Sequence, residues 1–511
     1  MKVLFLYPKY PDTFWSFKHC LPFIGKKASF PPLGLLTVAS LLPKNWEKKL
    51  VDLNIENLKE QDISWADMVF ISGMIVQKES AQECINLCKQ KGKTVVAGGP
   101  VFMTMHEQFN NVDHFILNEA EITLPLFLKD LEQGSAKKMY TSSERPDITS
   151  TPIPQWDLIN VNNYASMPVQ YSRGCPFNCE FCDIIIMNGR IPRTKTPEQM
   201  LAELQELYNT GWKGSVFVVD DNFIGNKKKV KELLPSIINW QKQRKYPFIF
   251  LTEASTNLAD DEELMDLMVE ANFSKVFLGI ETPNIESLKE IGKMQNVVRD
   301  LNQTVKKIHN KGLMVMGGFI VGFDNDTNSI FEKQIQFIQN AGIAVAMTGI
   351  LTALPKTRLW DRLKKEQRLL AETTGNNTKM HLNFIPKMGA EKLVDGYAEI
   401  LKSLYDPKNY YKRVDTFLKM YNPKVKKYVR KDEIKAFFRS MWKIGLCSKQ
   451  KIHFWKLFFS NIFKIKSLPV AIQLSIYGYH LQKIAEKNVE DMKLQKLLNT
   501  NEEQLLKPDI V

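Results

Sequence analysis

The chain has 511 residues, of which 44% are hydrophobic, and a formal net charge of +13. This length predicts two or three domains with buried cores, and no apolar run of about 18 residues indicates a membrane-spanning helix. The seven cysteines do not form a disulfide framework, because three lie in one short loop and the others are scattered. The N-terminal residues are typical of a strand and not of a signal peptide, so we expect a cytoplasmic protein.

Short apolar strands alternate with helical segments over residues 1–140. Strands are expected at residues 2–7, 49–53, 68–72, 94–97 and 114–117, and helices at 33–42, 81–91 and 121–132. This alternation predicts an α/β domain, Rossmann-like, with an open, doubly wound parallel sheet. Such sheets bind ligands beyond the carboxyl ends of their strands.

Two loops at this edge have sequences that suit a closely bound ligand. One follows the third strand and contains Ser72, Met74 and Gln77, and the other is the turn Gly98-Gly99. Two glycines at a strand end let the backbone approach a flat or phosphate-bearing ligand, although a tight turn alone uses the same residues. The G-x-G-x-x-G fingerprint is absent, which argues against a dinucleotide-binding domain.

Residues 141–165 are rich in proline and serine and are expected to be a linker. Residues 166–360 then repeat a strand–helix unit about six times, with strands expected at 168–172, 215–219, 248–252, 276–280, 315–321 and 344–351. This pattern predicts a partial (β/α)6 barrel, whose chemistry would lie at the carboxyl ends of its strands. Residues 361–511 are expected to form a mostly helical domain.

The loop after the first barrel strand contains Cys175, Cys179 and Cys182 with the spacing C-x3-C-x2-C. A structural zinc site uses four ligands, and a fully ligated iron–sulfur cluster usually takes four cysteines. Three thiolates on one loop leave one iron of a cluster open for another ligand. A zinc knuckle, or three buried structural cysteines, is the alternative interpretation.

Polar groups follow the next four strands of the expected barrel. They are Asp220 and Asp221, Glu253 and Ser255, Glu281, and the turn Gly322 to Asp326. Any one of these groups alone could be a helix cap or part of a surface ion pair. Because the carboxyl ends of parallel strands meet at one edge, their recurrence predicts one shared site.

The cysteine loop, with Phe181 directly before its last cysteine, resembles that of the radical S-adenosylmethionine (radical SAM) superfamily. The resemblance implies a [4Fe–4S] cluster on the three cysteines, SAM on the open iron, and reductive cleavage of SAM to a 5′-deoxyadenosyl radical. It also implies SAM contacts from Phe181, Asp220, Asp221, Glu253, Ser255, Glu281, Lys293 and Gly322. Asp220 and Asp221 stand where the family has a Gly-Gly-Glu-like motif, from which this sequence departs.

Placed before such a core, residues 1–140 resemble the cobalamin-binding domain of cobalamin-dependent radical SAM enzymes. The resemblance implies that cobalamin is held by Ser72, Met74, Gln77, Gly98 and Gly99. The Asp-x-His-x-x-Gly motif of other cobalamin proteins is absent, and residues 52–57 occupy its place without the His or the Gly. This departure would leave cobalt without a lower histidine ligand, and a Rossmann-like domain that binds no cobalamin stays open.

Two segments are similar to the subgroup that includes hopanoid C2 methylases, namely Thr-Glu-Ala-Ser-Thr-Asn-Leu-Ala (252–259) and Phe-Leu-Gly-Ile-Glu-Thr-Pro-Asn (277–284). That subgroup also has a C-terminal helical domain of unknown role, which residues 361–511 resemble. The resemblance implies a methyltransferase that acts through methylcobalamin on an unactivated carbon of a small-molecule or lipid substrate, with a reductant such as flavodoxin or ferredoxin. The alternatives are a radical SAM enzyme that rearranges or cyclises its substrate, and a metal-binding module that acts on RNA or membranes.

The C-terminal residues 401–511 carry 23 Lys and Arg against 10 Asp and Glu, an excess equal to the net charge of the whole chain. Within them, residues 449–481 have apolar side chains at helical spacing with lysines between, which predicts an amphipathic helix. Such a helix either packs on the barrel with a solvated basic face or lies peripherally on a membrane surface. No nucleic-acid-binding module is recognised, so we expect no nucleic acid partner.

Overall fold

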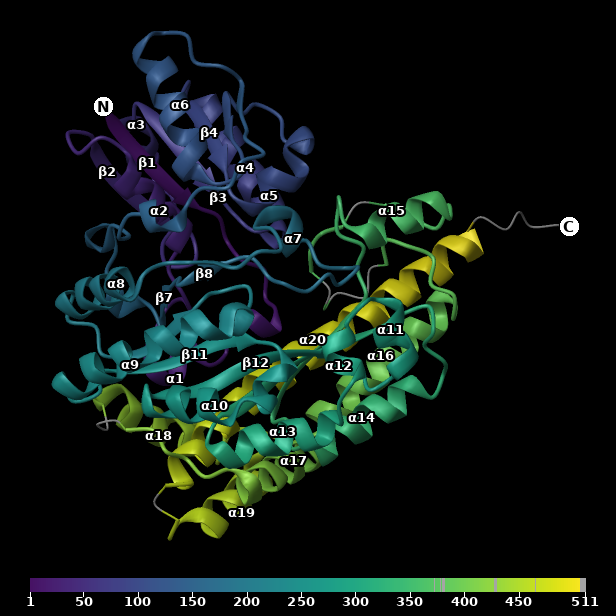
Figure 1. Ribbon diagram of the computed structural model, residues 1–511. Helices are drawn as coiled ribbons and strands as arrows, with labels where there is room; N and C mark the ends of the chain where they lie inside the picture. The colour runs from purple at the N-terminus through teal and green to yellow at the C-terminus, as the bar shows by residue number, and fades with distance from the viewer. Residues whose placement is uncertain (372, 377, 379–381, 427–429, 465, 506–511) are drawn as a thin grey trace, which may run out of the picture.

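The computed structural model describes residues 1–371, 373–376, 378, 382–426, 430–464 and 466–505, with side chains to residue 494. Figure 1 shows a parallel sheet in the upper part of the molecule, a second sheet below it, and the C-terminal helices around the lower sheet. This arrangement confirms the predicted fold class, with a doubly wound N-terminal sheet, an open barrel and a helical C-terminal region.

The first sheet has six parallel strands in the order β2-β1-β3-β4-β5-β6. They are β1 (Lys2–Tyr7), β2 (Glu47–Asp52), β3 (Met68–Ser72), β4 (Thr94–Gly98), β5 (His114–Ile116) and β6 (Met139–Tyr140). The helices are α2 (Leu33–Leu41), α3 (Glu60–Trp65), α4 (Lys78–Gln90), α5 (Pro100–Met105) and α6 (Ala120–Glu132). Strand order reverses at β1, so the carboxyl ends of β1 and β3 flank the crevice in which such sheets bind ligands.

The second sheet is also parallel and has the order β7-β10-β11-β12-β13-β14. Its strands are β7 (Met167–Val169), β10 (Gly214–Val218), β11 (Phe248–Ala254), β12 (Phe273–Glu281), β13 (Met314–Val321) and β14 (Val345–Ile350). The connecting helices are α8 (Pro197–Asn209), α9 (Lys227–Gln243), α10 (Glu262–Glu270), α13 (Leu301–Lys311) and α14 (Ile330–Asn340). Because β7 and β14 lie at opposite ends and do not pair, the barrel is partial.

The first barrel strand is shorter than the predicted range 168–172. After β7 the chain turns, and the next residues form a separate two-residue strand, β8 (Ser172–Arg173), antiparallel to β9 (Arg193–Thr194). The backbone N–H of Tyr171 donates to Asp220 Oδ1 at 2.8 Å in place of a ladder partner. The side chain of Asp220, which follows the neighbouring strand β10, therefore takes the place of a strand partner and ends the predicted strand early.

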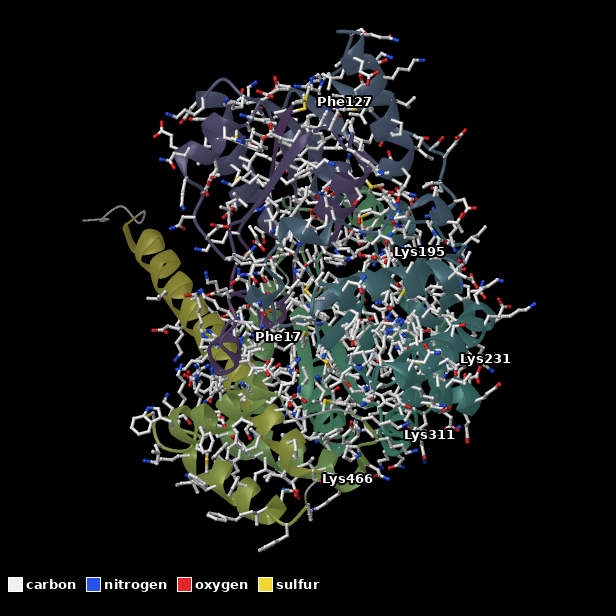
Figure 2. All side chains as sticks on the ribbon, turned by 90° about the vertical axis from the view of Figure 1, so that its left-hand side faces the viewer. Phe17, Phe127, Lys195, Lys231, Lys311 and Lys466 are labelled. Carbon is white, nitrogen blue, oxygen red and sulfur yellow. The ribbon has the colours of Figure 1, made fainter. Side chains whose placement is uncertain are left out.

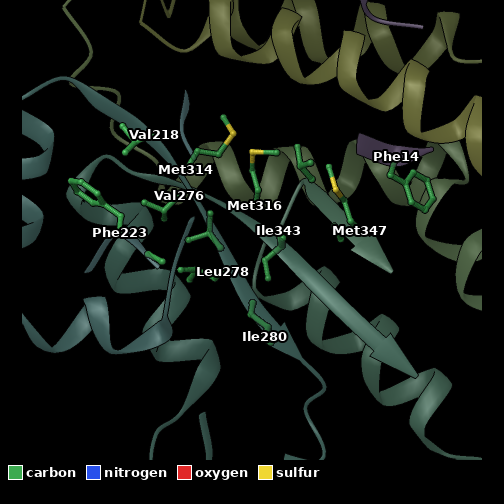
Figure 3. Close-up of a cluster of buried hydrophobic side chains, with 14 of the residues drawn as sticks. Phe14, Val218, Phe223, Val276, Leu278, Ile280, Met314, Met316, Ile343 and Met347 are labelled. Atoms are coloured by element: carbon green, nitrogen blue, oxygen red, sulfur yellow. The ribbon is translucent and has the colours of Figure 1, made fainter. Parts of the chain in front are cut away.

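The two faces of the barrel sheet pack against different parts of the chain. Figure 3 shows Val276, Leu278 and Ile280 on the side of the connecting helices, and Met316 and Met347 on the concave side. The C-terminal helix α20 (Leu468–Leu505) and the residues around Phe14 cover part of this concave side. The N- and C-terminal ends of the chain thus complete the core of the central barrel.

Residues 13–30 belong spatially to the barrel, although they precede most of the first sheet in sequence. The ring of Trp15 lies 4.6 Å from that of Phe277 on β12, and Phe17 lies 5.5 Å from Tyr477 on α20. Figure 2 shows Phe17 where the N-terminal segment meets the C-terminal helix. The sequence pattern over residues 1–140 does not indicate this excursion.

The C-terminal region is helical, as predicted. Its helices are α15 (Arg358–Lys365), α16 (Ala390–Tyr405), α17 (Pro407–Met420), α18 (Lys431–Lys443), α19 (Lys451–Asn461) and α20. The predicted amphipathic helix over residues 449–481 is wrong as one element, because α19 ends at Asn461 and α20 begins at Leu468. Pro469 lies in the first turn of α20, a position that suits proline. Ile465 lies outside the described residues, among which no helix could span a membrane.

Candidate active site

The predicted SAM-contacting residues gather at the carboxyl edge of the barrel. They follow or end four consecutive strands, with Asp220 and Asp221 after β10, Glu253 and Ser255 at β11, Glu281 at β12 and Gly322 after β13. The cysteine loop runs from β8 to α7 (Ile184–Met187), and Lys293 precedes the short helix α12 (Met294–Val297). The fold therefore brings these side chains into one region.

Backbone contacts fix the start of the cysteine loop. Gly174 has φ +102°, and a Cβ there would lie 2.9 Å from the carbonyl oxygen of Ile191. The N–H of Cys175 donates to the carbonyl of Gly189 at 3.1 Å. Only glycine suits position 174, because it tolerates both the positive φ and the close backbone.

Asp220 and Asp221 hold the cysteine loop against the barrel. Asp220 accepts hydrogen bonds from the backbone of Tyr171 and from Ser172 Oγ, at 2.8 and 2.6 Å. Asp221 accepts from the N–H of Gly174 at 2.8 Å and from the amide of Asn188. Burial raises the pKa of Asp220 to about 7. Both carboxylates support the loop in this structure, and their predicted contact with SAM remains a prediction.

Two amide side chains that we did not predict lie beside the cysteines. Asn222 Nδ2 donates to Cys175 Sγ, and Gln295 Nε2 donates to Cys179 Sγ, each at 3.9 Å. Hydrogen bonds to cysteine sulfurs are one means by which proteins set cluster potentials. Asn222 directly follows the predicted aspartates, whereas Gln295 reaches the loop only through the tertiary fold.

Glu253 differs from the other acids at this edge because it has no hydrogen-bond or ion-pair partner among the described residues. Burial, and then the nearby carboxylates of Asp221 and Asp220, raise its pKa to about 7. Ser255 accepts from Asn222 at 3.2 Å and donates to Asn257 at 2.5 Å. Glu253 is therefore the carboxylate at this edge that a ligand with hydroxyl groups could engage.

Glu281 and Lys293 form a buried ion pair. Glu281 has φ +63°, which is uncommon for a residue with a side chain. A Cβ at Gly279 would lie 2.6 Å from both Glu281 Oε1 and Lys293 Nζ, so glycine makes room for the pair. Burial alone would lower the pKa of Lys293, but Glu281, through its charge and hydrogen bond, together with the nearby Cys179 and Cys182 raises it. Lys293 Nζ also lies 6.0 Å from the centre of the Phe181 ring.

Phe181 and the residues after β13 lie next to one another. The Phe181 ring is 6.5 Å from that of Phe323. Gly322 has φ +106°, its N–H donates to Asp326 Oδ2 at 3.0 Å, and a Cβ there would lie 2.9 Å from Leu393 of α16. The sequence-predicted adenine side of the site is thus packed against the C-terminal region.

Arginines of the C-terminal region bind the outer side of the cysteine loop. Arg362 of α15 pairs with Glu180 at 2.7 Å and with Asp324 at 2.8 Å. Arg368 pairs with Asp324 at 2.6 Å. Burial alone would raise the pKa of Asp324, but these two guanidinium groups outweigh it and hold the pKa well below its usual range. No sequence motif indicated this network, which joins residues separated by more than 140 positions.

The predicted cobalamin-contacting residues lie at the carboxyl edge of the first sheet. Gln77 donates to the carbonyl of Pro8 at 2.5 Å and accepts from the N–H of Met74 at 2.8 Å, so it ties the ends of β1 and β3 together. Gly99 has φ +90°, and a Cβ there would collide with Ser72 Oγ. Met74 is exposed. These loops leave little room for side chains between the strand ends and a ligand.

The carboxyl edges of the two sheets meet at Arg173, two residues before the first loop cysteine. Arg173 pairs with Glu119 at 2.7 Å and with Glu121 at 2.8 Å, both at the start of α6. Arg193 pairs with Glu119 from β9 at 2.7 Å. The cysteine loop and the ligand-binding edge of the first sheet therefore face each other across a mostly buried seam.

Aromatic side chains lie on the concave face of the barrel beside Glu253. Phe277 is the register partner of Glu253, and Phe217 is the partner of Leu251, so all four lie on one face. Phe217 and Phe277 are only partly buried, and the side chain of Trp15, which contacts Phe277, is 41% exposed. The surface next to the predicted SAM site is thus aromatic and apolar.

The cysteine loop suits an iron–sulfur cluster better than a single metal ion. Among the described residues, no three His, Cys, Asp or Glu side chains are placed to hold one ion together. Cluster thiolates bind different irons and need not converge on one point. Burial raises the pKa of Cys175 and Cys179, and metal coordination removes such thiol protons. Three thiols on one loop, with amide donors beside two of them, fit the cluster.

Two family models match the chain. The radical SAM superfamily model covers residues 169–338, and a domain of unknown function (DUF4070) covers residues 357–493. The first contains the cysteine loop and most of the barrel, and the second contains the C-terminal helices.

Curated relatives are similar over most of the chain. An uncharacterised methyltransferase of Synechocystis is 48% identical, over 89% of this chain and 86% of its own length. Hopanoid C-2 methylase of Rhodopseudomonas palustris is 35% identical, over 89% of this chain and 88% of its own length.

The fold is similar to that of the radical SAM methyltransferase TsrM from Kitasatospora setae, whose structure contains cobalamin and a [4Fe–4S] cluster. The TM-score is 0.61, with 14% sequence identity, and the match covers 95% of this chain and 99% of the other. At this identity the likeness concerns the fold. Together with the cysteine loop and the relatives, it shows that the chain belongs to the radical SAM superfamily, in the group of methyltransferases that includes hopanoid C-2 methylase.

Proposed function

We propose that this protein is a cobalamin-dependent radical SAM methyltransferase that acts on an unactivated carbon of an apolar small molecule or lipid. The observation that carries the proposal is the seam at Arg173, which joins the cysteine loop to the ligand-binding edge of the first sheet. A methyl transfer of this kind needs the radical source and the methyl source on either side of one substrate. Two facing carboxyl edges of parallel sheets supply that arrangement.

The barrel edge would hold the cluster and SAM. When bound, the cluster and SAM supply the radical that removes hydrogen from the substrate, and cobalamin supplies the methyl group. Cys175, Cys179 and Cys182 would ligate the cluster, and Asn222 and Gln295 would donate hydrogen bonds to two of the sulfurs. Asp221 would keep the loop in place through Gly174.

Glu253 would bind the ribose of SAM, because a carboxylate that has no partner among the described residues can accept hydrogen bonds from two hydroxyl groups. Phe181 and the backbone at Gly322 would contact the adenine. The ammonium group of Lys293, held by Glu281, would face the SAM carboxylate. Each of these contacts is predicted from the family resemblance and is supported by the position of the residue at the barrel edge.

The first sheet would bind cobalamin through its loops. Gly98 and Gly99 keep side chains away from the strand ends, while Ser72, Met74 and Gln77 form the neighbouring loop after β3. No histidine lies in the segment 52–57, so this segment offers no lower imidazole ligand for cobalt. The backbone of these loops would exclude water from the face of cobalamin that lies against the first sheet.

The substrate would lie against Trp15, Phe217 and Phe277, because these side chains form the apolar surface next to Glu253. This surface and the hopanoid C-2 methylase relative favour an apolar lipid. A small electron carrier such as flavodoxin or ferredoxin would reduce the cluster in the cytoplasm. The domain boundaries 1–140, 141–165, 166–360 and 361–511 are part of this proposal.

The cluster assignment is tested on anaerobically reconstituted full-length protein by visible absorption and electron paramagnetic resonance after reduction. We expect a [4Fe–4S] signal in the wild type and none in the triple variant Cys175→Ala, Cys179→Ala, Cys182→Ala. Cys447→Ala is the matched control, because Cys447 is exposed and distant in sequence from the loop. A cluster that persists in the triple variant would refute the ligand assignment.

A further inference from the structure

An apolar stripe on α18 faces away from the rest of the protein. Ile434, Phe438 and Trp442 are spaced four residues apart, so they share one helix face, and all three are exposed, Trp442 by 64%. The opposite side of α18 is occupied, since Ala436 and Ser440 are buried. A helix on the surface of a protein normally turns such a stripe toward the core.

The helix α19 and the turn after it continue this apolar surface. Ile452 and Phe459 are exposed, and Phe463 is 94% exposed. Phe437 of α18 and Phe458 of α19 lie 6.2 Å apart, so the two helices pack together. Trp455 donates to the carbonyl of Gly445 at 2.9 Å and stacks on Phe459. Contiguous exposed apolar surface of this kind marks an interaction site.

The charge around this surface has one sign. No Asp or Glu occurs between Glu433 and Glu486. Eight Lys and Arg side chains lie between residues 434 and 466, and all eight are exposed, namely Lys435, Arg439, Lys443, Lys449, Lys451, Lys456, Lys464 and Lys466. Figure 1 shows α18 and α19 at the end of the molecule opposite the first sheet, and Figure 2 shows Lys466 at the same end.

From these observations we propose that α18 and α19 form a docking surface for an anionic phospholipid bilayer. Aromatic and aliphatic side chains would insert at the level of the headgroups, and the surrounding lysines would pair with anionic lipids. A second copy of this chain fits less well, because a symmetric interface would place this cationic surface against itself.

Contacts with residues 22 and 23 connect the docking surface to the N-terminal segment that also contains Trp15. Arg439 of α18 donates to the carbonyl of Pro22 at 2.9 Å, and Lys443 lies over the Phe23 ring. Pro22 and Phe23 belong to α1 (Leu21–Ile24), in the same segment as Trp15, which contacts Phe277. The link to an apolar substrate drawn from the bilayer rests on the proposed function, whereas binding to the bilayer does not.

The test is sedimentation of the full-length protein with phosphatidylcholine vesicles that contain or lack phosphatidylglycerol, without SAM or reductant. The wild type should bind the anionic vesicles and bind neutral vesicles at least about tenfold more weakly. The variant Phe438→Ser, Trp442→Ser, Phe463→Ser should lose at least about tenfold in affinity for anionic vesicles. Leu87→Ser, Leu126→Ser is the matched control, because these side chains on α4 and α6 are 47% and 49% exposed and should not alter binding.

Phe463→Ser alone provides a second variant if the triple variant folds poorly, since its side chain contacts almost nothing. Wild-type protein that stays in the supernatant with anionic vesicles would overturn the proposal. So would a folded triple variant that binds as the wild type does, or protein that self-associates through this surface and releases vesicles as it does so. Because the assay involves no catalysis, its failure would leave the methyltransferase proposal untouched.

Discussion

The carboxyl edges of the two parallel sheets present different chemistry to their ligands. The barrel edge carries Glu253, a carboxylate to which the described part of the chain offers no hydrogen-bond or ion-pair partner, beside the cysteine loop. At the first sheet the acids already have partners, since Asp52 accepts from Tyr164 at 3.0 Å and Glu119 pairs with Arg193. The carboxyl edge of the first sheet instead presents backbone groups and the glycines Gly98 and Gly99 to a ligand. The contrast indicates a polar, hydroxyl-bearing ligand at the barrel and a large, flat ligand at the first sheet.

The seam between the edges is where the largest effect is expected. Arg173→Gln would leave Glu119 and Glu121 without one of their cations in a mostly buried position, which should lower the free energy of unfolding by about 3 kcal/mol. Chemical denaturation measures this change. Lys242→Gln is the control, because Lys242 pairs with Glu270 on the surface and should cost less than about 1 kcal/mol. Equal costs for the two variants would mean that the seam does not hold the sheets together.

The charged edge is tested at Glu253. Replacing it with glutamine removes a charged acceptor of hydrogen bonds, and kcat/KM for SAM cleavage should fall about 10- to 100-fold while the cluster spectrum is unchanged. Formation of 5′-deoxyadenosine measures the effect. Glu270→Gln is the control and should have no effect. Glu270 is exposed at the end of α10, before the amino end of β12, whereas Glu253 lies near the carboxyl end of β11. An unchanged kcat/KM in Glu253→Gln would remove this residue from the SAM site.

The glycine-rich edge is tested at Gly99. A methyl group there would collide with Ser72 Oγ on a backbone with positive φ, so Gly99→Ala should weaken cobalamin binding by about tenfold. Corrin absorption during titration reports the affinity, and SAM cleavage should continue. Gly92→Ala is the control, because Gly92 also has a positive φ but open space around the Cβ position. If both variants bind cobalamin equally well, the turn at Gly99 is not part of the site.

The smallest expected effect is a pH dependence of SAM binding. The pKa of Glu253 is raised to about 7 by burial and by Asp221 and Asp220, so the carboxylate forms as the pH rises through 7. SAM affinity should therefore increase from pH 6 to pH 8 by at most about tenfold in total, because the ionised fraction of a group with this pKa rises by about that factor. In Glu253→Gln this dependence should flatten. A wild-type affinity that is constant over this range would contradict the proposed contact.

Much of the fold follows from local sequence patterns. Apolar runs such as residues 2–7 and 68–72 coincide with β1 and β3, because strands buried on both faces are nearly continuous in apolar residues. The cysteine loop and the acids after the strands were also visible locally. The helix predicted over residues 449–481 failed because Pro469 starts a new helix after a turn.

The contacts that organise the site were not predictable from these patterns. Gln295 at Cys179, Arg362 at Glu180, and Arg173 at Glu119 join residues that are far apart in sequence. The packing of Trp15 on Phe277 likewise depends on a chain excursion that no periodicity signals. The exposure of Trp442 and Phe463 could not be distinguished from burial, because an amphipathic pattern does not show what covers its apolar face.

The central claim is that the protein combines a radical source, SAM at the barrel edge, with a methyl source, cobalamin at the first sheet, which a second SAM would methylate. It is tested most directly by supplying the reconstituted, cobalamin-loaded protein with SAM and a reductant and measuring both products. The account predicts corrin and cluster absorption together with 5′-deoxyadenosine and S-adenosylhomocysteine. Formation of 5′-deoxyadenosine without S-adenosylhomocysteine, in protein that retains no corrin, would contradict it and favour a rearranging or cyclising radical SAM enzyme.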